Sequence, residues 1–455
     1  MEQTEQKENL IARFGASFSK VTQKLLPDTM AIGLILAVII FLAGMLVCGQ
    51  TPVQMFNYFN GGMWNLLAFS MQATVMVVMA NVAASTKPVT RFLNAIASVP
   101  KTPTQAIMFG SFICLGLFAI HSTFALIFGA IYAKTVARKI KGIHYPLLAA
   151  VCYSGYLTWH CFSGGTIPLL MATEGSWAAE LVGYTIPFKD MVFIPINITL
   201  VVIFLITVPL LYRMMMPKDH ILEVSPSLFK DEENEVFYTL PEHPTPAQRI
   251  EYSRVLTLMM GIVLVLYMVQ RVIQAGLNAL DLNYINVAML AISFLCVDNV
   301  VDFGKRTAKC ISVAGGIIVQ FPIYAGIMGM VSASGLGAAI AGLFVGIATK
   351  ETLPNVLSIS SFIVHLFVPS GGSKWAIEAP IYIDAAKQLG ADIPVVCMAT
   401  AWGDAVGKLV QPFWAIPLLA IAKLSAKDIM GYCMTMAIYA FAVLQLVLLL
   451  YNCIL

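Results

Sequence analysis

Charged side chains are scarce in this chain of 455 residues, where Asp, Glu, Lys and Arg together make up 11% of the sequence. Soluble globular domains carry about 25% charged residues. Hydrophobic residues instead make up 59% of the chain, and many runs reach the roughly 20 apolar residues that a helix needs to cross a lipid bilayer. The composition excludes an ordinary soluble domain and predicts an all-α polytopic membrane protein. It gives no reason to expect a nucleic-acid partner.

Motifs for metal binding and for catalysis are missing as well. The nine cysteines form no C-x-x-C pair, and the histidines show no H-x-x-x-H spacing, so neither a disulfide framework nor a metal site is expected. No G-x-S-x-G nucleophile elbow is present. The polar N-terminus lacks the apolar core and the cleavage site of a secretory signal. We therefore expect a protein that is not an enzyme and that needs no cofactor.

Basic residues predict the topology of the first half of the chain. Lys20 and Lys24 precede the first apolar span and Lys87 follows the second, so the positive-inside rule places both flanks in the cytoplasm. The apolar segment 105–133 ends at another basic cluster, which begins at Lys134. Because this segment starts and ends on the same side, we expect a re-entrant helical hairpin.

The same counting predicts that the second half runs in the opposite sense. The apolar segment 355–386 is entered from outside, after Lys350 and Glu351, and forms a second re-entrant hairpin. Counting predicts nine crossings, a cytoplasmic N-terminus, an external C-terminus and a turn after residue 302. The expected parts are a cytoplasmic N-terminal segment (1–27), a first repeat (28–212) with hairpin 105–133 and broken helix 146–170, a cytoplasmic loop and linking helix (213–283), and an inverted second repeat (284–455) with hairpin 355–386 and broken helix 392–421.

Four expected interruptions of helices form two symmetric pairs. Two are the hairpin tips, 121–123 and 369–373, and two lie in the broken helices, at 158–166 and 402–412. Non-helical backbone survives at membrane depth only where it lines a protein cavity or a site. Helix N-termini at such breaks favour a carboxylate. This pattern is typical of the binding site of a secondary transporter.

The interruptions also supply the candidate site residues. Hydroxyl groups, freed backbone groups, an indole and one lysine could bind an anionic substrate. The expected substrate-binding residues are Ser122, Thr123, Trp159, Ser163, Gly164, Ser370, Gly371, Gly372, Ser373 and Lys374. The expected ion-coupling residues are His121, Thr166, Gly403 and Asp404.

Two lysine–carboxylate spacings leave alternatives open. Lys374 is either a counter-ion for the substrate or the partner of Glu378, since the two are four residues apart. Asp404 either responds to the coupling ion or pairs with Lys408 at the same spacing.

The roles of two histidines also leave alternatives open. His121 and His160 could each accept a proton or be hydrogen-bonded structural residues. His365 lies on the apolar arm of the second hairpin and is expected to be structural.

Several strings resemble the bacterial short-chain fatty acid transporter family of the AtoE type. They are YLTWHCFSGGTIPLLMAT (156–173), VQFPIYAGIMGMVSASGLG (319–337), FVPSGGSKW (367–375), QPFWAIPLLAIA (411–422) and DIMGYC (428–433). The resemblance implies uptake of short monocarboxylates, such as acetoacetate or butyrate, across the bacterial cytoplasmic membrane. It also implies membership of a wider ion-transporter superfamily, in which several members are homodimeric elevators coupled to Na⁺ or H⁺.

The second tip departs from the family pattern, because Ser373 and Lys374 stand where the family has glycine and histidine. An added lysine could suit a second carboxylate, so a dicarboxylate or a keto acid is an alternative substrate. An anion channel is a further alternative, although a channel would need a continuous polar pore. We expect cation-coupled symport of a small carboxylate by an elevator mechanism, with Na⁺ or H⁺ as the coupling ion and a homodimeric assembly.

Overall fold

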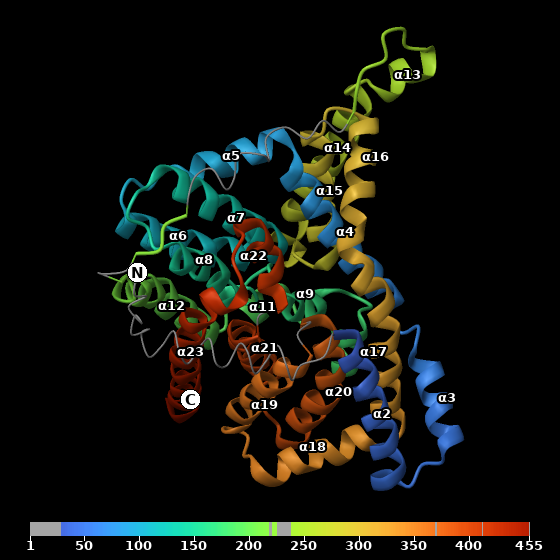
Figure 1. The fold of residues 1–455 in the computed structure, drawn as a ribbon. Coiled ribbons are helices and arrows are strands. Elements are labelled where there is room, and N and C mark those ends of the chain that lie inside the picture. The colour runs from blue at the N-terminus through green and yellow to red at the C-terminus, as the bar shows by residue number, and fades with distance from the viewer. Residues whose placement is uncertain (1–28, 218–220, 225–237, 369–370, 412, 455) are drawn as a thin grey trace, which may run out of the picture.

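The structure is a computed structural model that describes residues 29–217, 221–224, 238–368, 371–411 and 413–454. Within these residues every regular element is helical (Figure 1). The first half contains α2 (Thr29–Cys48), α3 (Pro52–Gly62), α4 (Leu67–Ser85), α5 (Lys87–Ala97), α6 (Pro103–Ile120), α7 (Ser122–Lys139), α8 (Tyr145–Ser154), η1 (Gly155–Thr158), α9 (Thr166–Ala172), α10 (Trp177–Val182), α11 (Phe188–Val192) and α12 (Pro195–Met214). The second half contains α13 (Pro246–Glu251), α14 (Val255–Ala275), η3 (Gly276–Ala279), α15 (Leu282–Cys296), α16 (Val300–Cys310), η4 (Ile311–Ala314), α17 (Gly315–Ala333), α18 (Leu336–Ile347), α19 (Leu353–Phe367), α20 (Gly371–Leu389), α21 (Ile393–Val410), η5 (Phe413–Ala415), α22 (Ile416–Ala422) and α23 (Ala426–Ile454).

Seven helical segments in the described part of the chain are long and apolar enough to cross a membrane. They are Leu67–Ser85, Pro103–Ile120, Pro195–Met214, Pro246–Ala279, Val300–Ala333, Ile393–Val410 and Ala426–Tyr451. This confirms the predicted all-α, multi-pass membrane protein. Segment Pro103–Ile120 is also the first arm of the predicted re-entrant hairpin, so the count of nine crossings stays a prediction.

The order of elements repeats along the chain. A long helix (α4 or α17) leads into a short arm (α5 or α18), then a helix pair (α6–α7 or α19–α20), then an interrupted helix (α8–α9 or α21–α22). The two pairs cover the ranges of the predicted hairpins, and the interrupted helices cover 146–170 and 392–421. The opposite sense of the two repeats in a membrane stays a prediction.

The turn predicted after residue 302 is wrong. Asn299 caps a helix there, since its Oδ1 accepts the backbone N–H of Asp302 at 2.9 Å. Arg306 is buried within this helix, α16, and its Nε donates to Asp302 Oδ1 at 2.8 Å. Its Nη1 donates to the carbonyl of Ser85 at 2.6 Å. The ion pair lies within α16, and the hydrogen bond from Arg306 to Ser85 joins this helix to the end of α4. The chain turns before α16, at 297–299. Helix α3 was not predicted either.

Two large hydrophobic cores hold the helices together. The first unites the α6–α7 pair with α8, α12, α21, α22 and α23, and the second unites α2, α9, α15, α17, α18 and α20. In Figure 1 the helices α6, α8, α12 and α23 accordingly lie on the left, and α2, α3 and α17 on the lower right. Helix α21 contributes side chains to both cores, as does the chain from η1 to α9. Both interrupted helices thus lie at the boundary between the cores.

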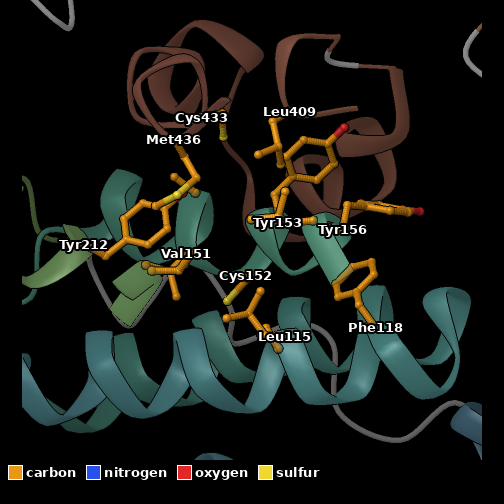
Figure 2. Close-up of a cluster of buried hydrophobic side chains, with 14 of the residues drawn as sticks. Leu115, Phe118, Val151, Cys152, Tyr153, Tyr156, Tyr212, Leu409, Cys433 and Met436 are labelled. Carbon is orange, nitrogen blue, oxygen red and sulfur yellow. The ribbon is translucent and has the colours of Figure 1, made fainter. Parts of the chain in front are cut away.

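Aromatic residues of the first core fix the end of α21. Figure 2 shows Tyr153 and Tyr156 between α6 and the C-terminal helices. The ring of Tyr156 packs on Phe118 with centroids 4.4 Å apart. The hydroxyl of Tyr153 lies 2.7 Å from the carbonyl of Lys408 and 3.0 Å from that of Gln411, which satisfies carbonyls left open where α21 ends.

Candidate functional site

The first interruption lies between η1 and α9, where residues 159–165 are not helical. A Cβ on Gly164 would lie 1.8 Å from the carbonyl oxygen of Phe118, so only glycine fits this position. The N–H of Gly164 donates to the carbonyl of Ala119 at 2.6 Å, and Ser163 Oγ donates to that of Ile120 at 2.9 Å. Both residues therefore satisfy carbonyls at the end of α6. Their predicted role as substrate ligands stays a prediction.

His121 forms the tip between α6 and α7. Its Nδ1 accepts the N–H of Phe124 at 3.3 Å, so the residue is the N-cap of α7. Its Nε2 is buried and has no hydrogen-bond partner among the described residues. Ser122 and Thr123 follow in the first turn of α7 and are half-buried.

The second tip packs against aromatic rings. Ser370 and the side chain of Ser373 lie outside the described residues. A Cβ on Gly371 would lie 2.5 Å from the ring of Trp159 and 3.5 Å from Asp404 Oδ2, and one on Gly372 would lie 2.7 Å from the ring of Phe69. The same Cβ on Gly372 would lie 3.6 Å from the methyl group of Thr166. The start of α20 thus meets the first interruption and Asp404.

The break predicted from Trp402 to Pro412 is narrower in the structure. Helix α21 is intact through Gly403 and Gly407, and it ends at Val410. A Cβ on Gly403 would lie 2.2 Å from the carbonyl of Ser358, and one on Gly407 would lie 2.7 Å from the Cβ of His365. These glycines let α19 pack closely on α21. The expectation that Gly403 lies in unwound backbone is therefore wrong.

Asp404 is the centre of a buried cluster of ionisable side chains. Its Oδ1 accepts from His365 Nδ1 at 2.7 Å and from Lys374 Nζ at 3.0 Å. Its Oδ2 accepts from His160 Nε2 at 3.1 Å. All four side chains are almost fully buried. The groups come from α19, α20, α21 and the first interruption, so both arms of the second hairpin, α21 and the first interruption meet at this carboxylate.

Lys374 also pairs with Glu378. The distance from its Nζ to Glu378 Oε2 is 3.0 Å, and it donates to the carbonyl of Ser361 at 3.3 Å. The alternative that the sequence left open, an internal pair with Glu378, is therefore present. The sequence did not predict that Lys374 also contacts a second carboxylate, that of Asp404.

Lys408 lies one turn beyond Asp404 on α21, among aromatic rings. Its Nζ is 4.2 Å from the ring centroid of Trp159, 5.2 Å from that of Tyr156 and 5.0 Å from that of Trp414. Cations are attracted to such ring faces. The cluster thus contains two lysines and two carboxylates, and its formal charge is zero when both histidines are neutral.

Asn197 on α12 positions both interrupted helices. Its Oδ1 accepts from Trp402 Nε1 at 2.9 Å, and its Nδ2 donates to the carbonyl of Cys161 at 2.9 Å. The side chain is almost fully buried. It therefore ties α21 to the first interruption.

Several members of the cluster were not among the candidate site residues. His160 was considered as a proton acceptor, Glu378 and Lys408 were considered as ion-pair partners, and His365 was expected to be structural. Their position in the sequence could have identified them, because ionisable residues inside apolar segments usually have a function. No group of three or more metal-ligating side chains is found in the described part of the chain.

Comparisons with known proteins agree with the resemblance. The family model for short chain fatty acid transporters matches residues 10–451. A relative from Escherichia coli (strain K12) is 37% identical over 436 residues, which cover 95% of this chain and 98% of the relative. A relative from Haemophilus influenzae is 34% identical over 437 residues, which cover 94% and 97%. Both relatives carry the name of a short-chain fatty acid transporter.

Two solved transporters share the fold at 13% sequence identity. The YdaH transporter of Alcanivorax borkumensis, described as having an unusual topology, aligns with a TM-score of 0.60 over 94% of this chain and 98% of its own. MtrF of Neisseria gonorrhoeae, described within a class of antimetabolite efflux pumps, aligns with a TM-score of 0.56 over 96% and 97%. These two likenesses support the fold alone. The family match and the two relatives show that this chain belongs to the short-chain fatty acid transporter family.

Proposed function

We propose that this protein is a secondary active carrier that takes up short-chain monocarboxylates of the acetoacetate and butyrate class. The family assignment supports this substrate class. The observation that carries the proposal is the buried cluster around Asp404, in which lysines and carboxylates meet between two hydrophobic cores. An unmatched charge buried between hydrophobic cores costs free energy. The ionisable groups of the cluster therefore indicate that the protein binds and transports an ion.

The charge balance of the cluster favours coupling to a cation. The formal charges of Lys374, Lys408, Asp404 and Glu378 sum to zero, so a bound carboxylate leaves one unmatched negative charge. A cation that enters with the substrate would remove this excess. Burial of an isolated charge costs far more than burial of a matched pair, so the loaded carrier would move more readily when the cation is bound.

The partners of Asp404 favour a proton as that cation. Asp404 is contacted by the nitrogen atoms of Lys374, His160 and His365, whereas hard cations such as Na⁺ prefer sets of oxygen ligands. The second ring nitrogens, His160 Nδ1 and His365 Nε2, are buried and have no hydrogen-bond partner among the described residues. Either nitrogen could receive the proton.

An elevator is the proposed mode of movement. The transport domain would contain the two hairpins and the two interrupted helices, together with α12 and α23, because these share the first core with α6 and α7. The scaffold would contain α2, α3, α4 and α14–α17. We further propose that the protein is a homodimer in the bacterial cytoplasmic membrane, with a cytoplasmic N-terminus and an external C-terminus.

Uptake into proteoliposomes tests the function. We expect saturable uptake of labelled butyrate and acetoacetate that is stimulated by an imposed proton gradient. Asp404→Asn should lower the initial rate by at least ~10-fold, because loss of one partner of a buried ion pair leaves the other charges unmatched. Asp190→Asn is the matched control, since Asp190 lies exposed on α11.

Four outcomes contradict separate parts of the proposal. Stimulation by a sodium gradient alone rules out the proton, and no stimulation by either ion rules out symport. Transport of succinate without transport of butyrate favours the dicarboxylate alternative. Ohmic anion currents through the reconstituted protein indicate a channel.

A further inference from the structure

The two carboxylates of the cluster are held by different numbers of donors. Asp404 accepts from three nitrogen atoms, which are His365 Nδ1 at 2.7 Å, Lys374 Nζ at 3.0 Å and His160 Nε2 at 3.1 Å. Among the described residues, the one nitrogen that Glu378 contacts is Lys374 Nζ at 3.0 Å, which it shares with Asp404. Hydrogen bonds to a carboxylate favour its charged form, so Asp404 is the carboxylate that stays charged.

Two hydroxyl groups lie beside Glu378, but each is closer to another acceptor. Tyr382 Oη is 3.3 Å from Glu378 Oε1 and 2.7 Å from Ser360 Oγ. Ser361 Oγ is 3.5 Å from Glu378 Oε2 and 2.9 Å from the carbonyl oxygen of Thr400. A hydroxyl group has one proton to donate, and it can also accept. Glu378 is therefore poorly satisfied as an anion, whereas a protonated Glu378 can donate to Tyr382.

The two histidines of the cluster lack such an acceptor for a second proton. His160 and His365 each use one ring nitrogen to contact Asp404. The other nitrogens, His160 Nδ1 and His365 Nε2, are buried and have no hydrogen-bond partner among the described residues. A proton bound there would create a buried, charged N–H group without an acceptor, which is more costly than a neutral one. Glu378 therefore offers the coupling proton a better site than either histidine.

Outside the cluster, the elements packed against α20 bring little charge to Glu378. Helices α9, α17 and α18 pack on α20, and their sequences contain no Asp, Glu, Lys, Arg or His. Tyr324 of α17 lies against α2, since a Cβ on Gly33 would lie 3.3 Å from its hydroxyl oxygen. Glu180 of α10 is exposed. The ionisable groups of the cluster around Glu378 are Lys374, Asp404, Lys408, His160 and His365. A proton on Glu378 therefore leaves the cluster with one positive charge in excess, which one bound carboxylate balances.

The hydroxyl groups of Tyr382 and Ser360 lead from Glu378 toward the open end of the second hairpin. Tyr382 lies one turn beyond Glu378 on α20 and is almost fully buried, and Ser360 on α19 is half-buried. Both lie farther from the tip along their helices than Glu378 does. Because each hydroxyl group can both accept and donate, a proton can pass from Ser360 through Tyr382 to Glu378 when both hydroxyl groups rotate. The open end of this hairpin is predicted to face the external side, from which an uptake symporter loads its proton.

We propose that Glu378 binds the coupling proton, which reaches it from the external side through the hydroxyl groups of Ser360 and Tyr382. Asp404 stays charged and paired with Lys374. This assignment rests on the proposed proton-coupled carrier and deepens it, because it places the proton on one carboxylate of α20 and gives it a route from one side. The sequence had indicated Glu378 only as an ion-pair partner of Lys374.

Transport of labelled acetoacetate by proteoliposomes tests the assignment, with the rate in protein-free liposomes subtracted. For the unmodified protein, we expect an inward gradient of one pH unit to raise the initial rate several-fold, up to the ~10-fold change in proton occupancy that one unit allows. In Glu378→Gln the gradient should change the rate by less than ~2-fold, or about 0.4 kcal/mol, because the amide does not bind a proton in this range. Exchange of internal for external acetoacetate at equal pH should be retained, since glutamine resembles the protonated side chain.

Two further variants test the site and the route. Asp384→Asn is the matched control, because Asp384 is half-buried on the same helix and accepts from Gln388 Nε2 at 3.1 Å. It should keep the response to the gradient. Tyr382→Phe keeps the ring that packs on Phe344 and removes the hydroxyl group. Its gradient-driven rate should fall by at least ~10-fold, since a positioned proton-transfer group contributes at least this much, while exchange at equal pH continues.

The assignment is wrong if Glu378→Gln still responds to the gradient as Asp384→Asn does. It is also wrong if folded Glu378→Gln loses exchange together with the response, because Glu378 is then only the structural partner of Lys374. An unchanged gradient-driven rate in Tyr382→Phe overturns the route, and it overturns the whole assignment if Glu378→Gln fails to fold. Failure of the unmodified protein to exchange acetoacetate, or to respond to a proton gradient, would instead overturn the proposed carrier or its coupling ion.

Discussion

Gly164 shows why one residue of the first interruption cannot carry a side chain. An added Cβ would lie 1.8 Å from the carbonyl oxygen of Phe118 and 2.9 Å from that of Ala119. Backbone atoms of a packed helix cannot move aside as the end of a flexible side chain can. The N–H of Gly164 also donates to Ala119, so a shift of the interruption would break this contact.

We expect Gly164→Ala to destabilise the protein by about 1–3 kcal/mol, as overpacking does in other cores. The midpoint of thermal unfolding in detergent, followed by tryptophan fluorescence, should fall. Gly116→Ala is the control, because a Cβ there meets nothing within 4 Å. Alanine within a helix is favoured over glycine by about 0.5–1 kcal/mol, so this midpoint should stay or rise. Equal midpoints for the two variants would contradict the close approach at Gly164.

The sequence alone cannot predict whether a glycine in an apolar segment marks unwound backbone or close helix packing. Gly164 and Gly403 give the same signal in sequence, a glycine within an apolar segment. Gly164 lies in unwound backbone, whereas Gly403 lies within intact α21 and lets Ser358 of α19 approach. Unwinding and close helix packing both need a residue without a Cβ, so only the neighbouring helix distinguishes them. The partners of Asp404 could not be predicted from the sequence either, because His160 lies 244 residues away along the chain.

Among the elements, a short segment of the central loop contacts the start of the first interrupted helix. We call residues 221–224 the strap. The N–H of Leu222 donates to His144 Nδ1 at 3.1 Å, and the N–H of Tyr145 donates to the carbonyl of Leu222 at 2.9 Å. Glu223 Oε1 accepts the N–H of Gly142 at 2.5 Å. Part of the predicted cytoplasmic loop therefore contacts the N-terminus of α8.

The strap should be sensitive to pH through His144. Burial lowers the pKa of His144 below its ordinary value, and its Nδ1 must stay unprotonated to accept from Leu222. A group whose pKa is lower in the folded protein contributes stability above its unfolded pKa, about 6.5 for histidine. This contribution is lost as the pH falls through the folded pKa. We expect hydrogen exchange of the Leu222 and Tyr145 amides to become faster between pH 7.5 and pH 5, after correction for the intrinsic rate.

Two variants check the role of His144. In His144→Asn a side-chain oxygen replaces the ring acceptor and does not titrate in this range, so protection of the strap should not change with pH. His243 is exposed, and His243→Ala should keep the response of the unmodified protein. A pH response that survives in His144→Asn would assign it to another group.

Helix existence was predictable from length and hydrophobicity, whereas helix ends were not. The first repeat is predicted to begin at residue 28, and its first helix, α2, is present and runs from Thr29 to Cys48. The turn after residue 302 was placed by Lys305, Arg306 and Lys309, because three basic residues normally avoid a helix in lipid. Arg306 is instead buried against Asp302 and Ser85. A charge count cannot register a partner that lies 221 residues away along the chain.

At the scale of the whole molecule, the two cores meet at the candidate site. The first core includes Trp159, Trp402 and Leu409, and the second includes Trp375, Ile377 and Met398. Asp404 and Lys374 are adjacent to these residues in α21 and α20, so their ion pair lies where the cores meet. Charge counting and the helix-breaking residues predicted the ranges of the hairpins and of the interrupted helices, but not that their side chains meet at Asp404. They did not predict that α12 and α23 share the core of the first hairpin.

The elevator proposal makes a prediction about distances between the two bodies. Ile438 on α23 and Met259 on α14 are both exposed, and they lie on the proposed transport domain and scaffold. Spin labels at these positions, in a variant without its nine cysteines, should give two populations of distances. Butyrate at acidic pH should change their ratio, because a ligand shifts populations only when it binds the two states with different affinity.

A second pair of labels separates movement of the domains from local change. Met259 and Val313 are both exposed and both lie on the proposed scaffold, in α14 and η4. Their distance should stay the same with and without butyrate. If the first core moves as a rigid body, the Ile438–Met259 distance should change and the Met259–Val313 distance should not. A different outcome is that the Ile438–Met259 distance is unchanged as well while the labelled protein still transports butyrate. In that case the substrate crosses without movement of the first core. Access to the site must then change through the hairpin tips alone.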